Sequence, residues 1–318
     1  MPSKYPRIDL ADIKTISITD RKSKVNLKDF AATYNAGDTF GAFIDTLPDI
    51  LAGRWVRDII DRICIARHND RACAVAMGAH VIKCGLSPII IDLMRRGIIT
   101  SLSMNGAGAI HDTEMAFWGE TSEDVVDGMH SGLFGMARET ADFVNGCAVV
   151  ARDQGLGFGE ALGKAVVEAD AAHRDVSLLA AAYDYSVPLT IHACIGCDIV
   201  HMRPTAVGAA IGEASLADYR ILTQALRGLA GGGVLMNIGS AVVLPEVLLK
   251  ALTTLIDLGC DLKNMVGVNR DFVQHYRSNQ QVVSRVREIG GEGFALTGHH
   301  ELLIPLIAAG VIERMAES

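Results

Sequence analysis

The amino-acid sequence predicts an α/β fold, in which a doubly wound and mostly parallel sheet has helices on both faces and a helical insert. Two observations support this prediction. Short apolar runs rich in Val, Ile and Met recur from about residue 70, and most are followed by a helix-like stretch. The runs are continuously apolar, which is typical of parallel strands buried on both faces. We expect residues 1–35 to form an N-terminal arm or a peripheral helix, and residues 36–318 to form a single domain.

The amino-acid composition argues against some of the functions that a protein with this fold can have. The 318 residues include 37 acidic and 29 basic side chains, which gives a formal charge of −8. This acidic balance argues against a nucleic-acid partner, because nucleic-acid binding needs a basic surface. The mean hydropathy is +0.28, yet no uninterrupted run of about 18 apolar residues occurs, so we expect no membrane partner. A large core and a subunit interface explain the apolar composition.

The cysteines and the N-terminal segment indicate a compartment. There are seven cysteines, an odd number, and most have apolar neighbours. The N-terminal segment MPSKYPRIDL has no apolar stretch of the kind that directs secretion. We therefore expect reduced thiols in a cytoplasmic protein.

The predicted strands follow one another along the chain, each ending in small or polar residues. They are Ala72–Met77 before a helix at Leu86–Arg96, Ile98–Met104 before a helix at Ile110–Trp118, Pro188–Ile191, Gly233–Ile238 before a helix at Pro245–Leu258, and Asn264–Val268. The segment from Glu292 to Glu301 fits a further strand and turn, and Leu302–Ile312 fits the helix after them. Between the strands, the alanine-rich segment Gly135–Ala182 predicts the helical insert, and the glycine cluster Gln154–Gly159 predicts a loop and a helix start within it.

Glycine and polar residues at several strand ends indicate a nucleotide site. In an open parallel sheet, ligands bind beyond the carboxyl ends of the strands, at the point where the strand order reverses. Small residues there let backbone N–H groups approach a phosphate, and a following helix N-terminus adds positive partial charge. The candidate cofactor-binding residues are Gly78, Ala79, His80, Asn105, Gly106, Ala107, Gly108, Gly239, Ser240, Asn269 and Gly298. The alternative role for Asp112 or Thr113 is that of a helix cap.

Histidines are concentrated at the same places. Six of the ten lie at or just beyond predicted strand ends or glycine turns, namely His80, His111, His192, His201, His299 and His300. Histidine side chains at such positions are suited to acid–base chemistry near neutral pH. For the His299-His300-Glu301 turn, the alternative is a capping arrangement at the start of the last helix.

The cluster His192-x-Cys194-x-x-Cys197-Asp198 raises the possibility of a metal. A closed zinc site needs four ligands, no second Cys-x-x-Cys is present, and consecutive strand residues point to opposite faces. We therefore assign no metal ligand, and keep a metal-dependent hydrolase or lyase that uses His192, Cys194 and the His299–Glu301 turn as an alternative. A thioredoxin-like redox role is disfavoured, because that motif normally opens a helix near the start of its fold.

From about residue 35 onward, the order of motifs resembles the deoxyhypusine synthase family. Four segments carry the resemblance. They are Gly78–Arg96 with Ile98–Glu114, like the family's first nucleotide-binding strand–helix–strand; Tyr185–Asp198, in which Asp198 matches a polyamine-contacting carboxylate; Leu216–Val243 with Leu248–Asp261, like its glycine-rich turn; and Thr297–Pro305, like an NAD-contacting turn before a helix.

The resemblance implies a Rossmann-like sheet, the cofactor NAD, a small amine or polyamine-type substrate, and a homotetramer with active sites at subunit interfaces. The family's catalytic lysine is absent, since Val282–Val286 occupies the comparable stretch and no lysine follows Lys263. Arginine cannot replace it, because a guanidinium does not form a Schiff base. Lys83 and Lys250 are the core-region lysines near predicted strand ends.

We therefore predict an NAD-dependent enzyme of this superfamily, a deoxyhypusine synthase-like transferase, that acts on a small amine without the usual lysine imine. The candidate catalytic residues are His111, Asp112, Asp198, His299 and His300. The aspartates would hold a cationic substrate and the histidines would move protons. A non-catalytic nucleotide-binding oligomer is the other alternative, and the missing lysine is its motivation.

Overall fold

Six parallel strands form the centre of the molecule in residues 3–316, the part of the chain that the computed structural model describes. They are β1 (Cys73–Met77), β2 (Ser101–Asn105), β3 (Leu189–His192), β4 (Val234–Ile238), β5 (Val266–Asp271) and β6 (Glu292–Thr297). Their order in the sheet is β3-β2-β1-β4-β5-β6. This order is typical of dinucleotide-binding folds, and it reverses between β1 and β4. The predicted doubly wound α/β fold is confirmed.

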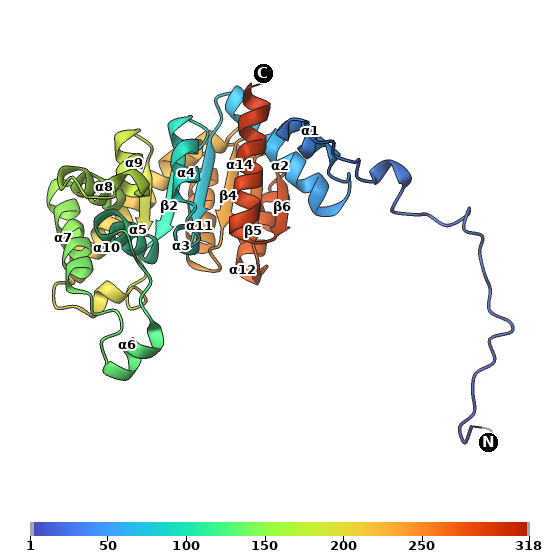
Figure 1. Ribbon diagram of the computed structural model, residues 1–318, viewed down its shortest axis with the longest axis horizontal. Coiled ribbons are helices and arrows are strands. Elements are labelled where there is room, and N and C mark those ends of the chain that lie inside the picture. The colour runs from blue at the N-terminus through green and yellow to red at the C-terminus, as the bar shows by residue number, and fades with distance from the viewer. Residues whose placement is uncertain (1–2, 317–318) are drawn as a thin grey trace.

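Helices cover both faces of this sheet (Figure 1). One core cluster joins α2, α4 and α14 through side chains such as Ile59, Ile90 and Ile304. A second cluster joins α11 and the end of α10 through Leu222 and Leu248. The α-helices are α1 (Phe40–Thr46), α2 (Leu51–His68), α3 (His80–Lys83), α4 (Ser87–Arg95), α5 (Gly106–Trp118), α6 (Val125–Ser131), α7 (Arg138–Gln154), α8 (Phe158–Glu168), α9 (Leu178–Asp184), α10 (Gly208–Ala225), α11 (Val243–Asp257), α12 (Tyr276–Ser278), α13 (Arg285–Glu288) and α14 (His300–Ala316).

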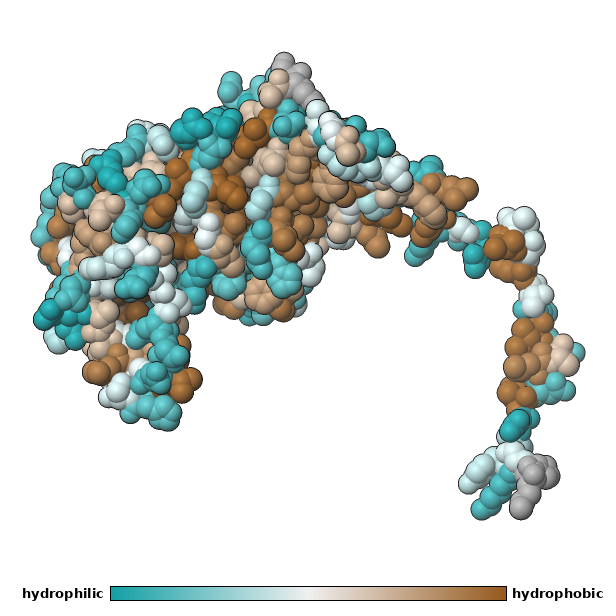
Figure 2. Space-filling view, viewed as in Figure 1, coloured by the Kyte–Doolittle hydropathy of each residue, from teal (hydrophilic) through white to brown (hydrophobic). Residues whose placement is uncertain are grey.

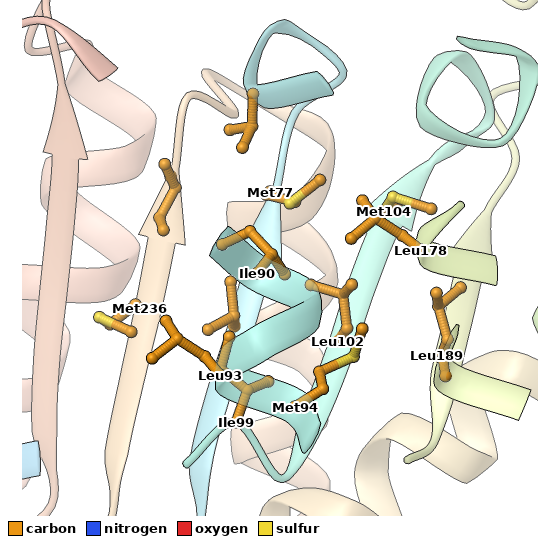
Figure 3. Packing of buried hydrophobic residues seen from close by; sticks show 14 of the residues in the cluster. Met77, Ile90, Leu93, Met94, Ile99, Leu102, Met104, Leu178, Leu189 and Met236 are labelled. Carbon is orange, nitrogen blue, oxygen red and sulfur yellow. The ribbon is translucent and has the colours of Figure 1, made fainter. Parts of the chain in front are cut away.

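The central strand β1 shows how the sequence serves both faces. Its residues are all buried, and alternate side chains belong to different clusters. Val75 and Met77 pack toward α4, whereas Ala74 and Ala76 pack toward α11. Figure 3 shows Met77 among the side chains of the larger cluster, close to Ile90 of α4. A continuously apolar strand is required for this arrangement, because neither face of β1 meets water.

The crossover from β2 to β3 contains α5 to α9, so the predicted helical insert lies there. Within it, α7 ends at Gly155, which adopts φ +68°, and Gly157 precedes α8. Positive φ is the backbone conformation that favours glycine at a helix end. The loop and helix start predicted for Gln154–Gly159 are confirmed.

A buried carboxylate of α10 accepts hydrogen bonds from β3 and from the start of α8. Asp218 is fully buried and accepts hydrogen bonds from Ile191 N–H at 2.5 Å and from Gly159 N–H at 2.9 Å. One bond therefore satisfies a strand N–H and the other a donor in the first turn of α8. Burial raises the pKa of Asp218 to about 7. The sequence analysis did not single out this residue.

The described part of the N-terminal segment lies outside the body of the molecule (Figure 1). Residues 3–26 contain neither helix nor strand, and they extend away from the body of the molecule (Figure 1). Their apolar side chains, including Ile8 and Ile16, are exposed, and Figure 2 shows apolar surface along the arm. The arm joins the body at Asp29, which is buried and whose carbonyl oxygen accepts from Asp49 N–H. Within residues 3–316, no helix is long and apolar enough to cross a membrane.

Candidate functional site

The strand-order reversal brings three predicted site residues together. A Cβ on Gly78, after β1, would overlap the carbonyl oxygen of Gly239, after β4. Gly239 has φ +65°, and a Cβ on it would lie 2.7 Å from Nε2 of His300. Only glycine allows these three segments to approach so closely. We refer to the region beyond the carboxyl ends of β1 and β4, next to Gly78, Gly239 and His300, as the crevice.

His300, the first residue of α14, presents an unsatisfied hydrogen-bonding group at this crevice. Its side chain is 1% exposed, and its Nδ1 accepts from the guanidinium of Arg270. Burial, followed by the charge of Arg270, lowers the pKa of His300 to about 4. The neutral ring must therefore carry its proton on Nε2. That atom is buried and has no hydrogen-bond partner among the described residues, which suits an acceptor atom of a ligand.

Arg270, near the end of β5, is a site residue that the sequence analysis did not assign. It is 2% exposed and also donates to the carbonyl oxygen of His299. Burial lowers the pKa of this guanidinium to about 10, so it remains charged at neutral pH. The buried Asp271 beside it lies 3.8 Å from His300 Nε2. A charged residue at the end of an apolar strand was the available signal, because such a group is rarely buried without a reason.

Aromatic rings form a rim around His300. The ring centroid of His80 lies 5.7 Å from that of His300 and 5.9 Å from that of Phe272. The ring of Phe272 stacks on His299 with centroids 6.4 Å apart. His80 and His299 are exposed.

The other predicted cofactor-binding residues near the crevice form hydrogen bonds to neighbouring protein groups. Asn269 is fully buried, and its Oδ1 accepts from Asn237. The Ser240 hydroxyl accepts from Leu244 N–H at the start of α11. Gly298 donates its N–H to the Asp271 carbonyl oxygen. The hydrogen bonds of Asn269, Ser240 and Gly298 are thus to other protein groups. Ala79 connects Gly78 to α3 and lies beside the crevice.

A cavity of about 580 Å³ lies beside α3 and α5. Its walls carry five carboxylates and a single lysine, namely Glu114, Glu120, Glu123, Glu139, Asp198 and Lys83. Trp118 and Phe134 add apolar surface. We refer to this space as the acidic cavity. An excess of carboxylates beside aromatic faces suits a cationic ligand with an aliphatic body.

The crevice and the acidic cavity are neighbours. The four-residue helix α3 begins with His80, whose ring faces His300, and ends with Lys83, which lines the cavity. Lys250, the other lysine that the sequence places near a strand end, instead pairs with Glu246 on the exposed side of α11. The two regions therefore adjoin opposite ends of α3.

A chain of hydrogen bonds orients His111 in the cavity wall. The hydroxyl of Thr121 lies 2.6 Å from Nδ1 of His111 and donates to Glu114. Because the Thr121 hydroxyl donates its hydrogen bond to Glu114, it can only accept one from His111. Nδ1 of His111 must therefore carry the ring proton and donate to Thr121. Thr140 donates to the other oxygen of Glu114 at 3.1 Å. Nε2 of His111 is thus left as the basic nitrogen, and burial lowers the pKa of the ring.

Glu114 and Thr121 were not assigned by the sequence analysis, although a signal for Glu114 was present. Residues three apart on a helix share a face, and His111 and Glu114 are separated by that interval in α5. No local pattern marks Thr121, because it lies in the loop after the helix and reaches His111 only in the folded chain.

The predicted catalytic residue Asp112 lies elsewhere. It is fully buried and accepts from the Ser177 hydroxyl and from the N–H groups of Leu178 and Leu179, at 2.6 to 3.1 Å. These bonds hold the N-terminus of α9, and burial raises the pKa of Asp112 to about 6. Asp112 therefore acts as a cap, but for α9 and not for its own helix. The cap of α5 is Asn105, whose Oδ1 accepts from Gly108 N–H, so α5 begins at Gly106 and not at Ile110.

Asp198 lies at the N-terminus of α5, where a phosphate was expected. A Cβ on Gly106 would overlap its carboxylate, which also accepts from Cys194 N–H at 3.0 Å. Asp198 is 8% exposed, burial raises its pKa, and it lines the acidic cavity. The segment Asn105–Gly108 therefore faces a protein carboxylate, and its Ala107 contributes to the cavity wall.

The structure does not support the metal alternative. His192 ends β3, whereas His299 and His300 follow β6, at the opposite edge of the sheet. Five interstrand spacings separate these edges, a distance of about 24 Å. No group of three or more His, Cys, Asp or Glu residues in 3–316 could hold a metal ion. His192 instead bonds to Thr190 at 3.1 Å, and burial lowers its pKa to about 4.

No protein-family model and no curated protein sequence matches this chain. Among solved structures, the complex of AgrE with ornithine and NAD⁺ is similar at a TM-score of 0.53 with 15% identity, over 85% of this chain and 35% of that one. The cyanobacterial arginine dihydrolase ArgZ gives 0.51 and 16%, over 82% and 33%. A proposed deoxyhypusine synthase from Entamoeba histolytica gives 0.47 and 7%, over 89% and 96%. This chain thus spans about a third of AgrE and ArgZ, and these two likenesses show a shared fold.

Proposed function

We propose that this protein is an NAD-dependent enzyme acting on a small amine or polyamine-type substrate. The observation that carries the proposal is the acidic cavity, whose lining includes five carboxylates and one lysine, although Glu139 is paired with Arg138. An ammonium group is attracted by such a wall, because charge-assisted hydrogen bonds to carboxylates are stronger than neutral ones. The ring of Trp118 offers a second type of contact for a cation.

NAD is assigned to the crevice. His300 Nε2–H is a buried donor without a partner among the described residues, and Arg270 is bonded to the other ring nitrogen, so these groups would attract an anionic or carbonyl oxygen. The backbone of Gly78, Ala79 and Gly239 would border the bound group. NAD supplies a hydride acceptor when bound. The fold shared with AgrE, which was crystallised with ornithine and NAD⁺, is consistent with this assignment.

His111 is assigned the role of general base. Its Nε2 would take a proton from the substrate ammonium in the cavity, which frees the lone pair on nitrogen. The Thr121–Glu114 chain holds the required tautomer, and the lowered pKa keeps the ring neutral at pH 7. Asp198 and Glu114 would hold the second cationic group of a diamine. None of these roles needs an enzyme lysine, in keeping with the absence of one at the family position.

The assembly we propose is a homotetramer with sites at subunit interfaces. Helix α6, beside the cavity, has no buried residue. Val126 and Met129 on it are 64% and 70% exposed. Exposed apolar surface of this kind is typical of an interaction site, and we assign its cover to a second copy of the chain. Sedimentation equilibrium of the full chain tests this, and a monomer at micromolar concentration would contradict it.

The decisive experiment is calorimetric titration of the full chain with spermidine and with NAD⁺. We expect both to bind, and reduced nicotinamide to appear only when both are present. A neutral diol of equal length is the matched control and should not bind. Lack of affinity for any cationic amine would overturn the proposal. Binding of NAD⁺ without reduction in the presence of amines would favour the non-catalytic nucleotide-binding oligomer.

A further inference from the structure

Cys194 and Cys197 occupy the first and fourth positions of a tight turn after β3. The Cys197 N–H donates to the Cys194 carbonyl oxygen at 2.9 Å. Gly196, at the third position, has φ +86°, the conformation that a type II turn requires there. The first and fourth Cα atoms of a β-turn lie within about 7 Å, and disulfides span about 4.4 to 6.8 Å. The backbone therefore holds the two residues at a distance that a disulfide can bridge.

The two side chains are also neighbours. The proximity of the Cys197 thiol, followed by burial, raises the pKa of Cys194. Cys197 is exposed and Cys194 is half-buried. An oxidant therefore has access to Cys197 first, and Cys194 is the neighbouring sulfur that can react next.

Three of the five other cysteines are poorly suited to oxidation. Cys73 and Cys147 are buried, and burial raises the pKa of both thiols to about 12. Burial likewise raises the pKa of Cys64 to about 11. Since the thiolate is the reactive form, these three residues stay reduced under conditions that oxidise an exposed thiol. Selectivity for the turn follows from its exposure and from the second sulfur within reach.

The turn forms part of the acidic cavity. Cys197 and Asp198 both line that space, and the Asp198 carboxylate accepts from Cys194 N–H. The motif follows a strand and is not the opening of a long helix, since a four-residue 3₁₀ turn, Ile199–Met202, comes next. This differs from the thioredoxin arrangement, and so the pair is not assigned an oxidoreductase role toward other proteins.

We propose that Cys194 and Cys197 are a reversible redox modification site, which a hydroperoxide converts to an intramolecular disulfide in the cavity wall. The Cys197 thiolate attacks one peroxide oxygen, the O–O bond breaks, and the other oxygen leaves as water after protonation. The Cys194 sulfur then displaces the hydroxyl from the resulting sulfenic acid as a second water. Two thiols and one hydrogen peroxide thus give one disulfide and two waters. A small dithiol reverses the reaction by thiol–disulfide exchange.

The test uses the full native chain, treated with one equivalent of hydrogen peroxide and measured by intact mass and peptide mapping. We expect the loss of two hydrogens, a single linked peptide joining Cys194 to Cys197, and full reversal by dithiothreitol. The C194S and C197S variants should lose this product, whereas C260S should retain it. Thermal unfolding of each variant verifies that it is folded.

Two results would overturn the proposal. One is a folded chain in which Cys197 goes directly to sulfinic acid while Cys194 stays reduced. The other is a disulfide that involves a different cysteine or a second chain. Neither readout involves NAD or an amine, so the outcome is independent of the proposed function.

Discussion

Gly78 and Gly239 touch backbone to backbone where the strand order reverses, which leaves no room for a side chain on Gly78. We expect G78A to lower the free energy of unfolding by about 1–3 kcal/mol, because the added methyl meets a carbonyl group that cannot move aside as a side chain would. Gly146 is the matched control, since a Cβ there would meet nothing within 4 Å and the residue lies inside α7. G146A should be neutral or stabilise by up to about 1 kcal/mol. Urea denaturation measures both, and equal stabilities would contradict the close approach.

Variants of Asp112 and Glu114 should distinguish a structural role from a role in substrate binding. D112A leaves three donors of α9 without an acceptor, and we expect it to destabilise the fold by about 3 kcal/mol. E114Q should fold with nearly unchanged stability but bind spermidine about tenfold more weakly, a difference of about 1.4 kcal/mol. Denaturation and calorimetry distinguish the two. An E114Q variant with unchanged spermidine affinity would remove Glu114 from the site.

The Thr121 hydroxyl should fix the tautomer of His111. In T121V, Nδ1 of His111 loses its acceptor, so the ring should become a mixture of both neutral tautomers. T121S keeps a hydroxyl and should retain the Nδ1–H form. Nitrogen-15 NMR of the histidine rings reports the tautomer without any assay of turnover. If T121V and the unmodified chain gave the same His111 spectrum, the hydrogen-bond chain would have no positioning role.

Buried histidines should make the fold sensitive to acid. Burial lowers the pKa of His192 from 6.5 to about 4. Between pH 6.5 and pH 4, His192 is therefore protonated in the unfolded chain but neutral in the folded chain. Stability is therefore lost as the pH falls through this window, by at most about 3 kcal/mol for this residue. The buried carboxyl groups of Asp112 and Asp218 act in the opposite sense, because their raised pKa values favour the fold at low pH.

The H192Q variant isolates the histidine contribution. Its free energy of unfolding should depend less steeply on pH than that of the unmodified chain between pH 4 and 6.5. Above pH 7 the two dependences should run parallel, which serves as an internal control. Identical slopes across the acid range would show that His192 has the same pKa in the folded and unfolded chains.

Continuous apolar runs predict strands β1 to β5, because these strands are buried along almost their whole length. The boundaries were less certain. The apolar run Ile98–Met104 starts before β2, which begins at Ser101, since Ile98 and Ile99 are buried without belonging to the strand. The run Asn264–Val268 stops short of Asp271 because Asn269 and Arg270 are polar, although both are buried in β5.

The site was predicted less completely, for a geometric reason. Asp112 and Glu114 are two positions apart in α5, which places them about 200° apart around the helix axis. One faces α9 and the other the cavity. Two carboxylates in one short motif thus have unrelated surroundings, and only the helix phase distinguishes them. Arg270 and Thr121 gain their roles through partners about 30 and 10 residues away, which no local motif encodes.

The order of the strands also has a consequence for synthesis on the ribosome. Strand β1 ends at Met77, but its neighbour β4 does not begin until Val234, so more than 150 residues must emerge before the middle of the sheet can close. Until then, β1 has one unpaired edge, and contacts this distant in sequence form slowly. An unpaired apolar edge invites association with other nascent chains. We therefore expect expression at low temperature, which slows chain–chain association, to increase the yield of folded protein.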